Sequence, residues 1–381
     1  MRDERQAMSD PAQKNQDKSP VIAMRGAGYY SANTIGAKAV IDAAADLVLE
    51  ALEGMALKAA TPFAIADFGA ADGGTSIDMM RRAVARIRKD APDRTVTITY
   101  TDLPHNDFSV LFRLVNGLLP GYEKDPLALL PGVLTFASGT SFYRPIFPAS
   151  TISLGFSATA MHWLSKLPIQ IADHTHAVGA APAEKQTIRA SALADWETIL
   201  LHRARELAPG GKLVFANFCE DEQGYYLGHT GGVNMHDEFA RHWRELWKAG
   251  SIGEAEYRRA NFVQFYKTKD DFIAPFQDPN SAVSKAGLVL EKAFTRITGC
   301  PYAAEFKTKG DPVAFARSYI PTLRSWSEST FMGALDPTRP AAERMAIVDR
   351  FYGAYEANVA AAPNGHGMDY VHCFMTVSKR A

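Results

Sequence analysis

The amino-acid sequence predicts an α/β fold with a doubly wound, mostly parallel sheet and a helical cap that follows it. Three observations carry this prediction. Short apolar segments alternate with helical patterns from residue 40 to about residue 218. A glycine-rich turn at residues 69–74 joins one apolar segment to a helix. After Cys219 the strand-like segments give way to pieces of helical periodicity and aromatic-rich loops.

The first elements form a helix, a strand, a tight turn and a second helix. Apolar residues recur at three- and four-residue steps over residues 40–54, which predicts an amphipathic helix. Residues 63–68 (FAIADF) are apolar and lie between a proline and a glycine, as expected for a strand buried on both faces of a parallel sheet. Helical periodicity resumes over residues 75–91, and the arginines of this segment lie on its solvent-facing side.

The later elements continue the alternation. Residues 95–101 are β-branched and aromatic and predict a strand, which a helix follows from Asp107. A helix near residues 190–207 is expected to stop at Pro209-Gly210-Gly211, and a helix near residues 342–359 comes late in the chain. The remaining strands are expected at residues 134–137, 152–156, 212–218 and 371–377.

These elements divide the chain of 381 residues into three expected regions. Residues 1–20 are polar and are expected to be a disordered lead-in. Residues 21–219 together with 336–381 are expected to form the α/β core. Residues 220–335 are expected to form a helical cap that covers the substrate.

The composition excludes several classes of function. Hydrophobic residues at 47% and charged residues at 22% are typical of a globular protein. With 41 basic and 42 acidic residues, the net charge of −1 gives no basic excess for binding nucleic acid. No apolar run reaches the roughly 18 residues of a membrane span, and three scattered cysteines match neither a zinc site nor a redox motif. We therefore expect a cytoplasmic protein with a small-molecule partner and no metal.

The glycine turn is a candidate cofactor site. Glycine between a strand and a helix lets a ligand approach the backbone and the free amides of the helix start. Residues 69–74 lack the Gly-x-Gly-x-x-Gly spacing that holds a pyrophosphate, and Asp67 and Asp72 would repel one, so a cationic cofactor fits better. Asp102 can accept hydrogen bonds from both hydroxyls of a ribose. Alternatively, the glycines only permit tight packing and Asp102 caps the next helix.

A series of sequence blocks within residues 24–168 carries a family resemblance. In chain order they are MRGAGYYSANT (24–34), ADFG (66–69), TDLPHNDF (101–108), GTSFYRPIFP (139–148) and MHWLSKLP (161–168). Together they resemble the SABATH family of S-adenosylmethionine-dependent carboxyl methyltransferases. The resemblance implies a Rossmann-like methyltransferase sheet with S-adenosylmethionine as cofactor and S-adenosylhomocysteine as product. It also raises a homodimer as a candidate assembly.

The resemblance implies which residues bind the cofactor. Tyr30, Thr34 and Asp67 would hold the methionyl end, and the aromatic ring of Phe142 would stack on the adenine. The full set runs from the methionyl end to the adenine and comprises Tyr30, Thr34, Asp67, Gly69, Asp102, Leu103, Ser141 and Phe142.

The resemblance also implies that His162 and Trp163 lie beside the substrate carboxylate together with Tyr30. Two departures from the family pattern change which side chains are expected to bind this carboxylate. Ala37 stands where the family has a glutamine, and Thr159 stands where it has a tyrosine. Either the acid is not the small aromatic acid usual for the family, or a donor from the cap replaces the missing one. The candidate donors are Asn234, His236, Gln264 and Tyr266.

The expected reaction is transfer of a methyl group to the carboxylate of a small organic acid. Such an acid is ionised at neutral pH, so no general base is needed. The runner-up is a methyltransferase acting on a hydroxyl or a nitrogen, with His162 as base. A non-catalytic cofactor-binding relative, an NAD-dependent oxidoreductase, and a hydrolase with the nucleophile in residues 155–157 are weaker hypotheses. Residues 174–176 (His-Thr-His) are expected to form a surface loop.

Overall fold

The computed structural model describes residues 35–57 and 61–381. The expected lead-in, the block at residues 24–34, and the candidate cofactor residues Tyr30 and Thr34 lie outside the described residues.

The core is a mixed sheet with the strand order β3-β2-β1-β4-β5-β8-β7, in which a short β6 pairs with β5. Pairing is parallel from β3 to β5, whereas β8 is antiparallel to both of its neighbours. The strands are β1 (Phe63–Phe68), β2 (Val96–Asp102), β3 (Val133–Gly139), β4 (Ile152–Ala158), β5 (Leu207–Glu220), β6 (Lys267–Thr268), β7 (Leu288–Thr298) and β8 (Tyr370–Lys379). The predicted α/β class is therefore confirmed.

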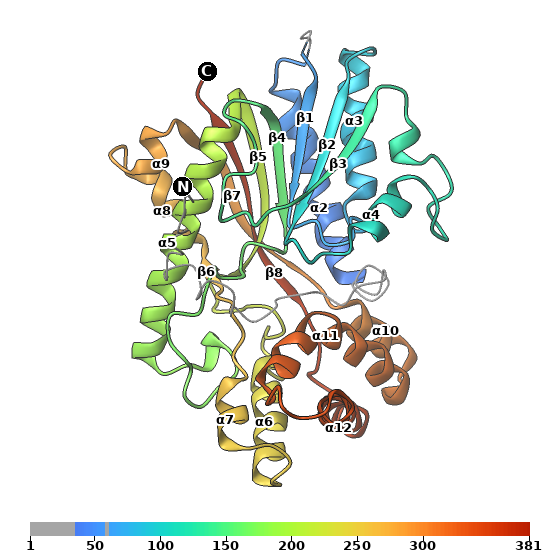
Figure 1. Ribbon diagram of the computed structural model, residues 1–381, viewed down its shortest axis with the longest axis vertical. Helices are drawn as coiled ribbons and strands as arrows, with labels where there is room; N and C mark the ends of the chain where they lie inside the picture. Colours follow the sequence, from blue (N-terminus) through green and yellow to red (C-terminus); the bar gives the residue numbers. More distant parts are fainter. Residues whose placement is uncertain (1–34, 58–60) are drawn as a thin grey trace, which may run out of the picture.

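Helices cover both faces of the sheet (Figure 1). One apolar cluster joins the sheet to α2 (Ile35–Glu53), α3 (Ile77–Asp90) and α4 (Phe108–Val115). A second cluster joins the opposite face to α5 (Pro182–Glu206), α8 (Lys269–Gln277) and α9 (Ala282–Lys285). Figure 1 shows the remaining helices gathered at one end of the sheet as a helical layer: α6 (Met235–Lys248), α7 (Glu254–Arg259), α10 (Pro301–Lys309), α11 (Pro312–Ala334) and α12 (Ala341–Ala361).

Local sequence explains the elements around the first turn. In α3, Ile77, Met80, Val84 and Ile87 are buried at three- and four-residue steps. The α4 helix begins after Asp107, whose carboxylate accepts a hydrogen bond from the Ser109 amide as an N-cap.

The structure differs from the predicted organisation at three places. The α5 helix ends at Glu206, and Pro209-Gly210-Gly211 forms an irregularity inside β5 where the register with β4 shifts. The strand β7 lies within the range assigned to the cap but pairs with β8 in the central sheet. The α12 helix lies within the range assigned to the core but packs on α11 and α6. Core and helical layer therefore interleave along the chain.

No helix in the described part of the chain is both long and apolar enough to cross a membrane.

Candidate functional site

The glycine turn lies at the carboxyl end of β1, where the strand order reverses between β2 and β4. Open α/β sheets bind ligands at such a position. Gly69 and Gly73 have φ angles of +78° and +76°. A Cβ atom added at Gly69 would lie 2.4 Å from the Cβ of Ala160, and one added at Gly73 would lie 2.3 Å from the side chain of Leu111. The turn therefore requires glycine at both positions.

A buried acid, Asp67, and a half-buried acid, Asp102, face this turn. Asp67 is 3% exposed and accepts a hydrogen bond of 2.6 Å from Ser76 Oγ. Burial, together with the nearby charge of Asp102, raises the pKa of Asp67 to about 7 against the hydrogen bond from Ser76. Both oxygens of Asp102 accept backbone hydrogen bonds of 2.7 Å, from Ala71 and Leu103, and burial raises the pKa of this carboxyl. Each oxygen of Asp102 retains a lone pair for a ligand hydroxyl.

The Phe142 loop lies beside the turn. A Cβ atom at Gly69 would be 3.8 Å from the Phe142 ring, so this ring borders the turn from the side of β4. Ser141 Oγ accepts a hydrogen bond of 3.3 Å from the Tyr143 amide, and Leu103 is half-buried. Of the eight predicted cofactor residues, Asp67, Gly69, Asp102 and Leu103 thus share the turn or its edge, and Ser141 and Phe142 lie on the adjoining loop.

A buried ion pair on α5 holds this loop. Arg203 and Glu206 are essentially unexposed and are joined by hydrogen bonds of 2.7 and 2.8 Å. Arg203 also donates to the carbonyl oxygens of Phe142 and Arg144 at 3.0 and 3.1 Å. Glu206 accepts the amides of residues 146 and 147. The pair therefore fixes the backbone that carries the Phe142 ring. This role was not predicted, because charged residues at these positions are typical of an ordinary helix end.

His162 and Trp163 follow β4 and are both buried. The His162 ring lies 4.8 Å from the Phe218 ring and 6.0 Å from the Tyr266 ring. Burial, with the nearby His372 and Lys267, moves the pKa of His162 well below its usual value. His162 is therefore a neutral imidazole at neutral pH.

Trp163 forms an isolated antiparallel bridge with Gln264, although 100 residues separate them in the chain. The amide of Leu164 donates to the Val263 carbonyl at 2.8 Å, and the amide of Phe265 donates to the His162 carbonyl at 2.9 Å. These bonds flank the bridge, so Trp163 and Gln264 form a non-hydrogen-bonded pair. In such pairs the opposing side chains lie on the same face and close together.

Gln264 is fully buried, yet within the described residues neither its carboxamide nitrogen nor its oxygen has a hydrogen-bond partner. A buried unpaired amide costs about 1–3 kcal/mol, so native proteins rarely leave one without a function. The predicted substrate donors Trp163 and Gln264 are thereby brought together.

Each of the other candidate donors has at least one side-chain hydrogen-bond partner. Asn234 caps α6 by accepting the His236 amide, and its nitrogen donates to the Tyr226 hydroxyl at 2.9 Å. His236 Nε2 and the Tyr266 hydroxyl lie 3.1 Å apart. Burial moves the pKa of His236 well below and that of Tyr266 well above the usual values, so both are neutral.

The two departures from the family pattern are Ala37 and Thr159. Ala37 is buried in the first turn of α2 and has no side-chain donor. Thr159 follows β4 with a φ angle of 53°, a strained conformation for a β-branched residue, and its amide donates to the Ala216 carbonyl at 2.9 Å. Such strain directly before His162 and Trp163 is typical of functional segments.

Several residues near the site were missed by sequence reasoning. His176 was expected on a surface loop, but the structure buries it fully, with its ring 4.1 Å from the His236 ring. Phe218 and His372 come from the neighbouring strands β5 and β8, and their rings lie 4.1 Å apart. Their positions at strand ends were the available signal, but the antiparallel insertion of β8 was needed to bring them together.

The hydrolase considered from the sequence is not supported by the geometry. Ser157, in the segment considered for a hydrolase, lies inside β4 and donates to the Phe68 carbonyl at 2.8 Å. Among residues 35–57 and 61–381, no group of three or more histidine, cysteine or acidic side chains could hold a metal ion.

Comparison with known proteins gives a consistent result. Residues 20–281 match the family described as SAM-dependent carboxyl methyltransferase. Loganic acid O-methyltransferase from Catharanthus roseus is 29% identical over 64% of this chain and 67% of its own length. Indole-3-acetate O-methyltransferase 1 from Arabidopsis thaliana is 28% identical over 53% of this chain and 56% of its own length. Salicylate/benzoate carboxyl methyltransferase from the same plant is 24% identical over 71% of this chain and 70% of its own length.

The fold matches that of a solved relative. A structure of loganic acid methyltransferase with S-adenosylhomocysteine superposes with a TM-score of 0.73 at 22% identity, and the match covers 94% of this chain and 99% of that one. For several curated relatives, including the indole-3-acetate enzyme, the chain spans only about half of the relative's length.

Proposed function

The chain belongs to the SABATH family of S-adenosylmethionine-dependent carboxyl methyltransferases, and from this membership we propose that it methylates the carboxylate of a small organic acid. The products are the methyl ester and S-adenosylhomocysteine. The observation that carries the proposal is the buried carboxamide of Gln264 opposite Trp163, which has no hydrogen-bond partner among the residues that the structure describes.

The residues around the glycine turn fit the cofactor. S-adenosylmethionine supplies an electrophilic methyl group on a positively charged sulfur. The Asp67 carboxylate suits its cationic methionyl end, Asp102 suits the ribose hydroxyls, and Phe142 offers a ring for the adenine. The lack of side chains at Gly69 and Gly73 keeps the backbone accessible to the ligand.

Trp163 and Gln264 bind the substrate carboxylate. The indole N–H and the carboxamide N–H₂ are neutral donors, and hydrogen bonds to a charged acceptor are worth about 1.5–3 kcal/mol each. Gln264 thereby takes the role of the family glutamine that Ala37 replaces. Burying a carboxylate without hydrogen-bond donors costs free energy, so both donors contribute to substrate binding.

The transfer needs no general base. The acid is already ionised, and catalysis rests on holding its oxygen in line with the methyl group, an effect worth roughly 7–11 kcal/mol. His162 is a poor base because its pKa lies well below the usual value. These properties favour a carboxylate over a hydroxyl or a ring nitrogen as acceptor. The predicted homodimer and cytoplasmic setting stay predictions.

The test is a screen of carboxylic acids for methyl ester formation, read by mass spectrometry, followed by two variants. Gln264→Leu keeps the volume but removes the donor, so we expect KM for the acid to rise roughly tenfold or more while the free energy of unfolding stays equal or increases. Trp163→Ala should also raise KM strongly.

The control is Gln170→Leu, which changes an exposed glutamine whose side chain donates to the Arg258 carbonyl. It should leave KM unchanged. If no acid yields an ester although S-adenosylhomocysteine binds, the chain is a non-catalytic relative. If Gln264→Leu leaves KM unchanged, the assignment of the carboxylate donor is wrong.

A further inference from the structure

Building on the proposed function, we propose that His176, His236 and Tyr266 form a second part of the acceptor site, which binds an uncharged oxygen of the acid, a hydroxyl or a carbonyl. The substrate is then an oxygenated acid rather than a plain hydrocarbon acid. This site is called the imidazole subsite below.

The tautomer of His176 follows from its hydrogen bonds. Its Nδ1 accepts the backbone N–H of Val178 at 3.1 Å, so Nδ1 carries no proton. Burial, together with the neighbouring His236, moves the pKa of His176 well below its usual value, so the ring is neutral and its single proton is on Nε2. This Nε2–H is buried and has no acceptor among the described residues. His176 is therefore an unpaired donor.

The pair of His236 and Tyr266 has a second unpaired proton. Neutral imidazole and phenol each carry one donor hydrogen, and only one of the two is used in their mutual contact of 3.1 Å. If the phenol donates to Nε2, the proton of His236 is on Nδ1, an atom without a partner in the described part of the chain. If Nε2 donates instead, the phenol hydrogen is free. Either arrangement leaves one donor.

These donors lie close to each other. The His176 ring stacks on the His236 ring at 4.1 Å and on the Tyr266 ring at 4.8 Å. Two donors on stacked rings without an acceptor in the described part of the chain favour a ligand oxygen that compensates for their burial. All three groups are neutral, and the carboxylate of the acid is already bound by Trp163 and Gln264, so we assign an uncharged oxygen of the same molecule to them. A second carboxylate would be desolvated beside them without a cation from this set.

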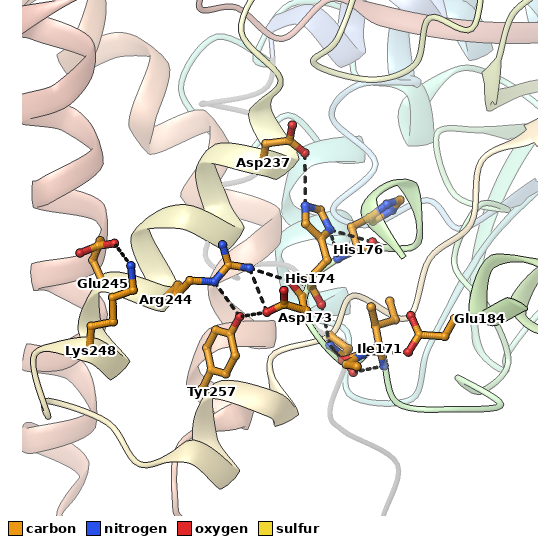
Figure 2. A network of polar contacts seen from close by, with 12 residues as sticks. Ile171, Asp173, His174, His176, Glu184, Asp237, Arg244, Glu245, Lys248 and Tyr257 are labelled. Atoms are coloured by element: carbon orange, nitrogen blue, oxygen red, sulfur yellow. Dashed lines mark hydrogen bonds and ion pairs between the residues drawn. The ribbon is translucent and has the colours of Figure 1, made fainter. Parts of the chain in front are cut away.

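A polar network fixes His176 in this position (Figure 2). Arg244 on α6 donates to the carbonyl of Asp173 at 2.8 Å and to its carboxylate at 3.0 Å. The Tyr257 hydroxyl donates to the same carboxylate at 2.9 Å. His174 Nε2 lies 3.3 Å from the carboxylate of Asp237, and His174 Nδ1 lies 2.8 Å from the carbonyl oxygen of His176, to which it can donate. The loop is thus tied to α6 and α7 through Asp173 and His174.

The imidazole subsite shares a face with the carboxylate donors. Val263 and Phe265 pack in one apolar cluster, whereas Phe262 and Tyr266 pack in another. Side chains therefore alternate along this segment, and Gln264 lies on the same face as Tyr266. Alternate residues of an extended segment are about 7 Å apart. One acid molecule can therefore contact Gln264 through its carboxylate and the imidazole subsite through a remote oxygen.

The experiment compares matched acids on the full chain. Benzoate and cyclohexanecarboxylate are each paired with their meta- and para-hydroxylated derivatives, and a para-dicarboxylate is included. Turnover gives kcat/KM, and titration calorimetry gives the Kd of each acid for the protein loaded with S-adenosylhomocysteine. We expect at least one hydroxylated acid to exceed its parent by about tenfold in kcat/KM and in affinity, and the dicarboxylate to be disfavoured.

Two variants locate the effect. His176→Phe should reduce the ratio between hydroxylated acid and parent to about one. His242→Phe is the matched control, because His242 is buried on α6 but stacks on Tyr355 at 5.0 Å, outside the subsite. It should keep the ratio. The ratio of kcat/KM for the hydroxylated acid to kcat/KM for its parent is measured within each protein. A smaller folded fraction lowers both values equally, so it does not change the ratio.

The outcomes separate the two proposals. Equal kcat/KM for the hydroxylated and parent acids would uphold the proposed function and overturn the subsite. A preference for hydroxylated acids in binding, without ester formation, would uphold the subsite and overturn the proposed function. A preference that survives in His176→Phe, or a dicarboxylate that outperforms the hydroxylated acids, would overturn the neutral subsite. If none of the acids binds, both proposals fail.

Discussion

The substitution Asp67→Asn tests the electrostatics of the cofactor turn, because it should stabilise the unliganded protein while weakening cofactor binding. The pKa of Asp67 is about 7 in the fold and 3.8 as its ordinary value. A difference of roughly three units corresponds to about 4 kcal/mol at pH values above 7. This penalty is the cost of keeping an ionised carboxylate buried with one hydrogen bond from Ser76.

The sign of the pH dependence follows from linkage. Because the pKa of Asp67 is raised in the folded state, its contribution to stability is fully present below the unfolded pKa and is lost as the pH rises through about 7. About 3 kcal/mol of this loss falls between about pH 5 and about pH 8. The carboxamide that Asp67→Asn introduces does not titrate. The variant should therefore gain about 3 kcal/mol over the parent protein between these two pH values.

The assay is urea denaturation of both proteins at the two pH values, with calorimetry of S-adenosylhomocysteine binding. Losing a hydrogen bond between charged groups should raise the Kd roughly tenfold or more. The control Asp46→Asn changes an exposed acid that pairs with Arg82 and should alter neither quantity. If Asp67→Asn and the parent protein change in parallel between the two pH values, Asp67 has an ordinary pKa and the reasoning fails.

Three further predictions concern the neighbouring elements. Arg203→Met should lower the free energy of unfolding by about 3–5 kcal/mol, because it leaves Glu206 buried without its partner, and the released loop should raise the Kd of S-adenosylhomocysteine; an unchanged unfolding curve would contradict this. Gly69→Ala should destabilise the protein more than Gly224→Ala. Both glycines have positive φ angles, but an added Cβ would contact Ala160 at Gly69, whereas at Gly224 it would meet no described atom within 4 Å. Equal urea midpoints would show that the close approach is unimportant. At saturating cofactor, the pH profile of kcat should show no inflection near 6.5, whereas an inflection that disappears in His162→Gln would identify a general base.

The acceptor site was predicted only in part. The motif around His162 and Trp163 and the missing donor at Ala37 were evident from the sequence, and Gln264 was one of four candidates to replace it. Choosing among these candidates required the pairing of residues 162–164 with residues 263–265. Periodicity within a window of about 10 to 20 residues carries no information on such a distant contact.

The sequence by itself determined the parallel half of the sheet and the cofactor turn. These features depend on local patterns, since a buried strand, a glycine turn and an amphipathic helix each have a signature within a few residues. Only the tertiary structure decided that β7 joins the sheet and that His176 is buried beside His236. Their environment is set by partners from distant segments, here β8 and α6, so the residues adjacent in the chain determine neither the register of β7 nor the burial of His176.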